Sequence, residues 1–87
     1  MQLIIHYSVT DYTAWKEAFD ADHEARTQAG LSLLQVWRHA DSAQHAFALM
    51  EVNDRARAES WITRSNALST DDAGTVTEAS HFFIETA

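Results

Sequence analysis

Asp22 and Arg26 stand four residues apart on a stretch that also carries Trp15 and Phe19 at helical spacing. A charged side chain inside a protein is costly unless it is paired or binds a ligand. The pair therefore predicts either a structural ion pair that braces a helix, or an arginine whose guanidinium fork holds a substrate carboxylate or phenolate. Arg38, near the end of an expected hairpin, is a weaker candidate for the same anion-binding role.

Five histidines supply side chains whose charge changes near neutral pH. If the first and last strands are neighbours, His6 and His81 could lie close together and move a proton as base and acid. His39 and His45 flank one expected hairpin. No HxH or HxxxH spacing is present, so a metal site is not favoured, and histidines that only form structural hydrogen bonds remain the alternative.

Three tryptophans could form the wall of a pocket for a flat ring, since binding pockets are mostly apolar with a few polar anchors. They could equally fill a core or a subunit interface. Helical spacing already explains Trp15 and Trp61 as core residues. Trp37 is expected to contact a ligand or a second subunit, and Trp61 stays a substrate-binding candidate.

The pattern of apolar residues predicts six elements in the order β-α-β-β-α-β. Asp11 and the pair Asn53-Asp54 are capping residues for two helices, and Gly30 is a helix stop. An exit loop is expected over residues 69–74. The strands are expected at 2–9, 31–39, 45–52 and 75–86, and the helices at 11–30 and 53–68.

This order predicts an α+β, ferredoxin-like domain over residues 1–87, with a four-stranded antiparallel sheet and two helices on one face. The strands carry apolar residues on both faces, which would leave a sheet-sized apolar surface exposed on a monomer. A homodimer through the sheet face is therefore expected. Strict alternation assigns the side chains to opposite faces of each strand. In the first strand Leu3, Ile5, Tyr7 and Val9 are on one face and Ile4 is on the other. In the second strand Leu31, Leu33 and Trp37 are opposite to Leu34 and Val36, and in the third Phe47 and Leu49 are opposite to Met50 and Val52.

Composition excludes several classes of function. The net charge is −7, with 13 acidic and 6 scattered basic residues, so nucleic acid and anionic membranes are not expected partners. The chain has no cysteine, which excludes thiol chemistry, and no glycine-rich phosphate loop. It has neither a basic, apolar leader nor a long apolar run, and a cytoplasmic location is expected.

Three spaced motifs run through the chain: Asp11-Tyr12-x-x-Trp15-x-x-x-Phe19-Asp20, Val36-Trp37-Arg38 and Ala58-x-x-Trp61-x-x-x-Ser65-x-x-Leu68. They resemble those of small bacterial proteins of the dimeric α/β-barrel superfamily, which is related to antibiotic-biosynthesis monooxygenases. The resemblance implies a cofactor-free oxygenase, a cyclase, an isomerase or a member of unknown activity, with a pocket between the helices and the sheet.

Two hypotheses follow. In the first, the chain is a cofactor-independent isomerase, cyclase or oxygenase for a small aromatic or polyketide-like substrate, with no metal. Arg26 would stabilise an enolate or phenolate, and His6 or His81 would move a proton. The substrate contacts would come from Asp22, Trp37, Arg38 and Trp61. In the second, the chain is a non-catalytic, dimeric small-ligand-binding or structural module.

Overall fold

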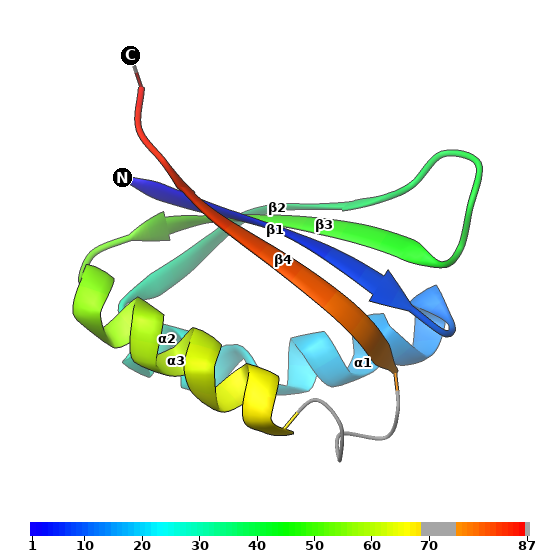
Figure 1. Ribbon diagram of the computed structural model, residues 1–87, viewed down its shortest axis with the longest axis horizontal. Coiled ribbons are helices and arrows are strands. Elements are labelled where there is room, and N and C mark those ends of the chain that lie inside the picture. The colour runs from blue at the N-terminus through cyan, green and yellow to red at the C-terminus, as the bar shows by residue number, and fades with distance from the viewer. Residues whose placement is uncertain (69–74, 87) are drawn as a thin grey trace.

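The computed structural model describes residues 1–68 and 75–86 of the chain. Within these residues, three helices lie on one face of a four-stranded sheet (Figure 1). The expected ferredoxin-like α+β fold is confirmed, although the first expected helix is divided in two. The elements are β1 (Gln2–Val9), α1 (Tyr12–Ala21), α2 (His23–Gln28), β2 (Leu31–Arg38), β3 (His45–Val52), α3 (Arg55–Leu68) and β4 (Val76–Ile84).

The strand order is β2-β3-β1-β4, and all three strand pairs are antiparallel. β1 therefore lies at the centre, with β4 as its neighbour, as the sequence predicted. The exit loop expected over residues 69–74 lies outside the described residues.

The break between α1 and α2 falls at Asp22. Asp11 caps α1 through its side chain, which accepts a hydrogen bond from the Thr13 backbone N–H at 3.2 Å. At the other end, the Asp22 N–H reaches back to the Phe19 carbonyl at 3.2 Å, a tightened turn of the kind that often ends an α-helix. The prediction of one helix as far as Gly30 is wrong for this reason.

Gly30 ends the helical segment in the left-handed region, with φ of 74°. A Cβ here would lie 3.2 Å from both the Cβ and the backbone N of Asp54. We expect Gly30→Ala to lower the free energy of unfolding by about 1–2 kcal/mol, because it combines backbone strain with this close approach. Urea unfolding measures the loss. Gly30→Asn, which tolerates the left-handed region better, should lose less, and equal losses would contradict a role for φ.

The core lies between the helices and the inner face of the sheet, the face that they cover. Leu3, Ile5 and Met50 are fully buried there. The helices contribute the buried side chains of Trp15, Phe19, Ala58 and Trp61. Burial of this layer is the main favourable term in folding.

The sequence prediction for β2 is wrong on one point. The register shifts between Leu33 and Gln35, so that Val36 lies opposite Ala48 and Trp37 opposite Phe47. An extra residue in a strand exchanges the faces of every later side chain. Trp37 is therefore on the outer face of the sheet, away from the helices, and Val36 is on the inner face.

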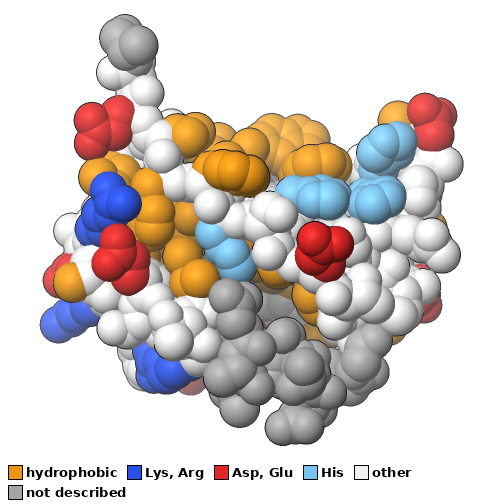
Figure 2. Space-filling view, viewed as in Figure 1, with side chains coloured by type: hydrophobic (Ala, Val, Ile, Leu, Met, Phe, Trp, Pro, Cys, Tyr) orange, Lys and Arg blue, Asp and Glu red, His pale blue; other side chains and the backbone are white. Residues whose placement is uncertain are grey.

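The outer face carries two rows of side chains across the strands, five of them large and apolar, and no described element covers it (Figures 1 and 2). Phe82 is 57 % exposed and Trp37 is 43 % exposed, which is unusual for large apolar residues grouped on one surface. The first row is Gln35, Leu49, Ile4 and Phe82; the second is Trp37, Phe47, His6 and Ser80.

No helix among residues 1–68 or 75–86 has both the length and the apolar character needed to cross a bilayer.

Candidate functional site

Arg26 is a buried cation between the helices and the sheet, with 3 % of its surface exposed. Its Nη1 donates a 2.6 Å hydrogen bond to the carbonyl of Phe19, in the last turn of α1. Its guanidinium carbon lies 3.8 Å from the centre of the Phe19 ring, a cation–π contact. Its Nε is buried and has no hydrogen-bond partner among the described residues. A buried donor left in this state costs about 1–3 kcal/mol, so it needs an explanation.

Asp22 is exposed, and no ion pair joins it to Arg26 in the described part of the chain. Burial lowers the pKa of Arg26, whereas Tyr7, Asp22 and Asp20 act in the opposite direction. An arginine keeps its charge at neutral pH even so. The direct ion pair that the sequence suggested is therefore replaced by a bond to a helix-end carbonyl.

Tyr7 is a second polar group of this layer, and the sequence analysis did not single it out. It points inward from β1, with its ring 5.0 Å from that of Trp15 and 6.2 Å from that of Phe19. Burial raises the pKa of Tyr7, although the Arg26 charge acts in the opposite direction. The phenol is thus protonated at neutral pH and can donate a hydrogen bond. The only signal in the sequence was a hydroxyl on an otherwise aliphatic row.

His81 also faces the helices, because it lies opposite Ile5 in the β1–β4 ladder. It is half-buried, and burial lowers its pKa, so the imidazole is neutral at pH 7 and can accept a proton. Thr75, just before β4, adds a second buried polar atom without a partner among the described residues, its Oγ1. The layer thus combines a cation, a phenolic donor and a neutral base.

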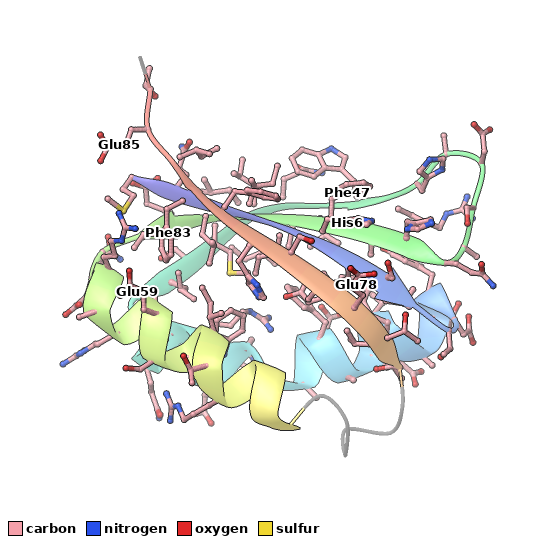
Figure 3. All side chains as sticks on the ribbon, viewed as in Figure 1. His6, Phe47, Glu59, Glu78, Phe83 and Glu85 are labelled. Atoms are coloured by element: carbon pink, nitrogen blue, oxygen red, sulfur yellow. The ribbon has the colours of Figure 1, made fainter. Side chains whose placement is uncertain are left out.

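His6 lies on the other side of the sheet. It is on a strand adjacent to His81, as expected, but it pairs with Ser80 across β4 and with Phe47 across β3. A displacement of one residue in the ladder puts the two imidazoles on opposite faces. They cannot share a proton, and Figure 3 shows His6 and Phe47 together on the side away from the helices.

The remaining candidates are scattered. Trp61 is buried in the core, at 6 % exposure, and Trp37 is on the outer face. Arg38 is exposed at the end of β2, opposite Ala46. Of the candidate catalytic and substrate-binding residues, Arg26, His81 and Trp61 are the buried or half-buried ones that share the layer between helices and sheet.

A groove of about 360 Å³ lies between α2 and α3 on the helical side of the molecule. It is lined by Gln28, Ala29, Ala56, Arg57, Ser60 and Arg64, and none of the candidate residues reaches it. Within the described ranges, no three His, Asp or Glu side chains are placed so that they could hold a metal ion.

Comparisons with known proteins support the fold. No protein-family model matches the chain, and no curated protein matches it in sequence. Solved structures do match, at low identity, so the expected resemblance is confirmed at the level of the fold.

Three of these structures illustrate the likeness. The cofactor-independent oxygenase SnoaB of Streptomyces nogalater has a TM-score of 0.64 and 12% identity, covering 99% of this chain and 93% of that one. A Nitrosomonas europaea protein assigned to the antibiotic biosynthesis monooxygenases has a TM-score of 0.67 and 18% identity, over 98% and 88% of the chains. An uncharacterised NIPSNAP domain protein of Burkholderia xenovorans has a TM-score of 0.68 and 12% identity, covering 100% of this chain and 95% of that one.

Proposed function

We propose, from the ferredoxin-like fold shared with a cofactor-independent oxygenase, that this chain acts on a small aromatic or polyketide-like molecule. The reaction class is a cofactor-independent oxygenation, isomerisation or cyclisation. The observation that carries the proposal is the Nε of Arg26, a buried donor with no described partner, beside the Phe19 ring. A substrate oxyanion would satisfy this donor, and the aromatic side chains would contact a flat ring.

The first step common to these reactions is the removal of a proton from the substrate. His81 accepts the proton from an O–H or an activated C–H, becoming an imidazolium, and the electron pair remains on the substrate as a phenolate or enolate. Arg26 and the O–H of Tyr7 stabilise that negative charge, more strongly than in water because the layer is buried. An oxygenase would then use dioxygen as its second substrate.

The proposal includes a second copy of the chain as the partner of the outer face. Phe82 and Trp37 are exposed there, next to the half-buried Ile4, Phe47 and Leu49. A face-to-face sheet contact would bury all five side chains and leave the helix-covered layer unchanged. A cytoplasmic location is part of the same proposal.

A second candidate function is a non-catalytic, dimeric binding or structural module. One observation favours it: the Nη1 of Arg26 is a second donor, beside the Asp22 N–H, to the Phe19 carbonyl at the end of α1. In that case Arg26 would serve the junction between α1 and α2, and no substrate would be needed.

A panel of phenols and enol lactones tests the proposal, with binding followed by tryptophan fluorescence and turnover by oxygen uptake and product analysis. We expect at least one compound to bind and to be converted. His81→Gln should then keep the affinity within about threefold and lose about a hundredfold or more of the rate, because only the base is removed. Arg64→Met, a change in the exposed groove, is the matched control. Binding without turnover would favour the binding module of the second candidate, and no binding by any compound would contradict the proposed activity and leave the structural module.

A further inference from the structure

Three histidines meet at one corner of the outer face, where β2, β3 and β1 come together. The rings of His6 and His45 have their centres 5.1 Å apart and are inclined by only 18°, and the ring of His39 is 5.7 Å from that of His45. Figure 2 shows histidine side chains gathered at one end of the hydrophobic surface. We call His6, His39 and His45 the histidine corner.

Two hydrogen bonds in the histidine corner need unprotonated ring nitrogens. The Nε2 of His6 and the Nδ1 of His45 are 3.0 Å apart, so one of them donates and the other accepts. The backbone N–H of Asp41 donates to the Nδ1 of His39 at 3.0 Å. Each acceptor must be a neutral imidazole, because a fully protonated ring has donors only. The geometry is thus that of a corner with at least two neutral rings.

The groups facing the corner offer little compensation for added charge. The Phe47 ring is 4.9 Å from that of His6, and Trp37 is opposite Phe47. From β4, Ser80 is opposite His6, and the carboxylate of Glu78 is one row further along. Asp41 contacts the corner through its backbone N–H. Arg38 lies opposite Ala46, so its side chain is on the inner face of the sheet and not at the corner. A second copy stacked on this face would remove water from two such corners.

We propose that the histidine corner makes self-association through the outer face proton-dependent, with the dimer formed at neutral pH and separated by acid. The inference rests on the dimer that accompanies the proposed function. Separate chains can bind a further proton on each corner, whereas the assembled face resists it because the charge would be buried beside aromatic rings. The separated state therefore binds more protons, and lower pH favours it.

Sedimentation velocity on the whole chain at about pH 8 and about pH 5.5 tests this inference, since imidazoles titrate between these values. We expect the dissociation constant of the dimer to rise about tenfold or more on acidification. The double variant His6→Gln, His45→Asn places amide groups where Nε2 and Nδ1 lie, so it can keep the bond without titrating. Its dissociation constant should change by less than about threefold. His23→Gln, an exposed change on α2, is the matched control and should behave as wild type.

The outcomes separate the two proposals. A monomer at about pH 8 overturns the dimer, and the histidine inference with it. A dimer whose affinity does not depend on pH, or a double variant as sensitive as wild type, overturns the histidine inference alone. Circular dichroism at both pH values excludes unfolding as the cause, which matters because burial lowers the pKa of His81 and its protonation in acid opposes folding.

Discussion

Phe82→Asp is expected to leave the chain folded and to abolish the self-association that we propose for the outer face. Phe82 lies opposite Ile4, in the same row as Leu49, and more than half of its surface is exposed in the single chain. The substitution therefore removes little of the core. In a face-to-face dimer the new carboxylate would be buried among apolar side chains, at a cost of several kcal/mol, which corresponds to a dissociation constant raised about a hundredfold or more.

Sedimentation velocity over a range of concentrations gives the dissociation constant, and urea unfolding gives the stability of the chain. Thr63→Asp adds the same charge at an exposed position of α3 and is the control. The control should associate as wild type does. A Phe82→Asp variant that keeps the wild-type dissociation constant would place the interface elsewhere on the molecule.

The order of the elements and the apolar residues of the outer face followed from the sequence because both depend on local patterns. Residues 2–9 alternate, so that Leu3, Ile5, Tyr7 and Val9 are all buried while Ile4 is on the other face. Asp54 predicted a helix start, and its side chain accepts the Arg57 backbone N–H at 3.1 Å. Pattern and capping chemistry are properties of a few neighbouring residues, and tertiary contacts did not override them here.

Two parts of the fold could not be obtained in this way. The bulge after Leu33 changes the face of Trp37, and nothing in the composition of that strand marks the extra residue. The break at Asp22 lies within an unbroken helical pattern. The bulge depends on how β2 pairs with β3, and the break is a tightened turn that the spacing of apolar residues does not reveal.

The candidate site was predictable in its residue types and not in its geometry. Arg26 was identified as a buried cation, which it is, but its partner is the Phe19 carbonyl instead of the Asp22 carboxylate. His6 and His81 were grouped because their strands were expected to be adjacent, and a register displaced by one residue separated them by the thickness of the sheet. Register is set by pairing across the whole sheet, so a single strand does not carry it.

Arg26→Met is expected to abolish ligand binding while leaving the stability of the chain unchanged or higher. The substitution loses one hydrogen bond, worth about 1.5–3 kcal/mol because its donor is charged, and a cation–π contact. It also removes a buried charge and an unpartnered Nε, and replacing buried charges by apolar groups of similar volume is often neutral or stabilising. The unfolding free energy of Arg26→Met should therefore lie within about 1 kcal/mol of the wild-type value, or above it. Affinity for a phenolate should fall about tenfold to a hundredfold or more.

The sign of the stability change decides what Arg26 is for. If Arg26 only stabilises the junction of α1 and α2, its removal destabilises the fold. Arg26→Met would then lower the unfolding free energy by about 3 kcal/mol or more. If Arg26 instead binds a substrate anion, its buried charge destabilises the fold in the absence of ligand. Arg26→Met would then leave the unfolding free energy unchanged or raise it. Arg26→Lys separates charge from shape: the ammonium keeps the charge and loses the fork, so partial affinity would show that charge alone contributes. Thermal unfolding and ligand titration of the wild type, Arg26→Met and Arg26→Lys measure stability and affinity. A destabilised Arg26→Met variant would contradict the proposed function at its central residue.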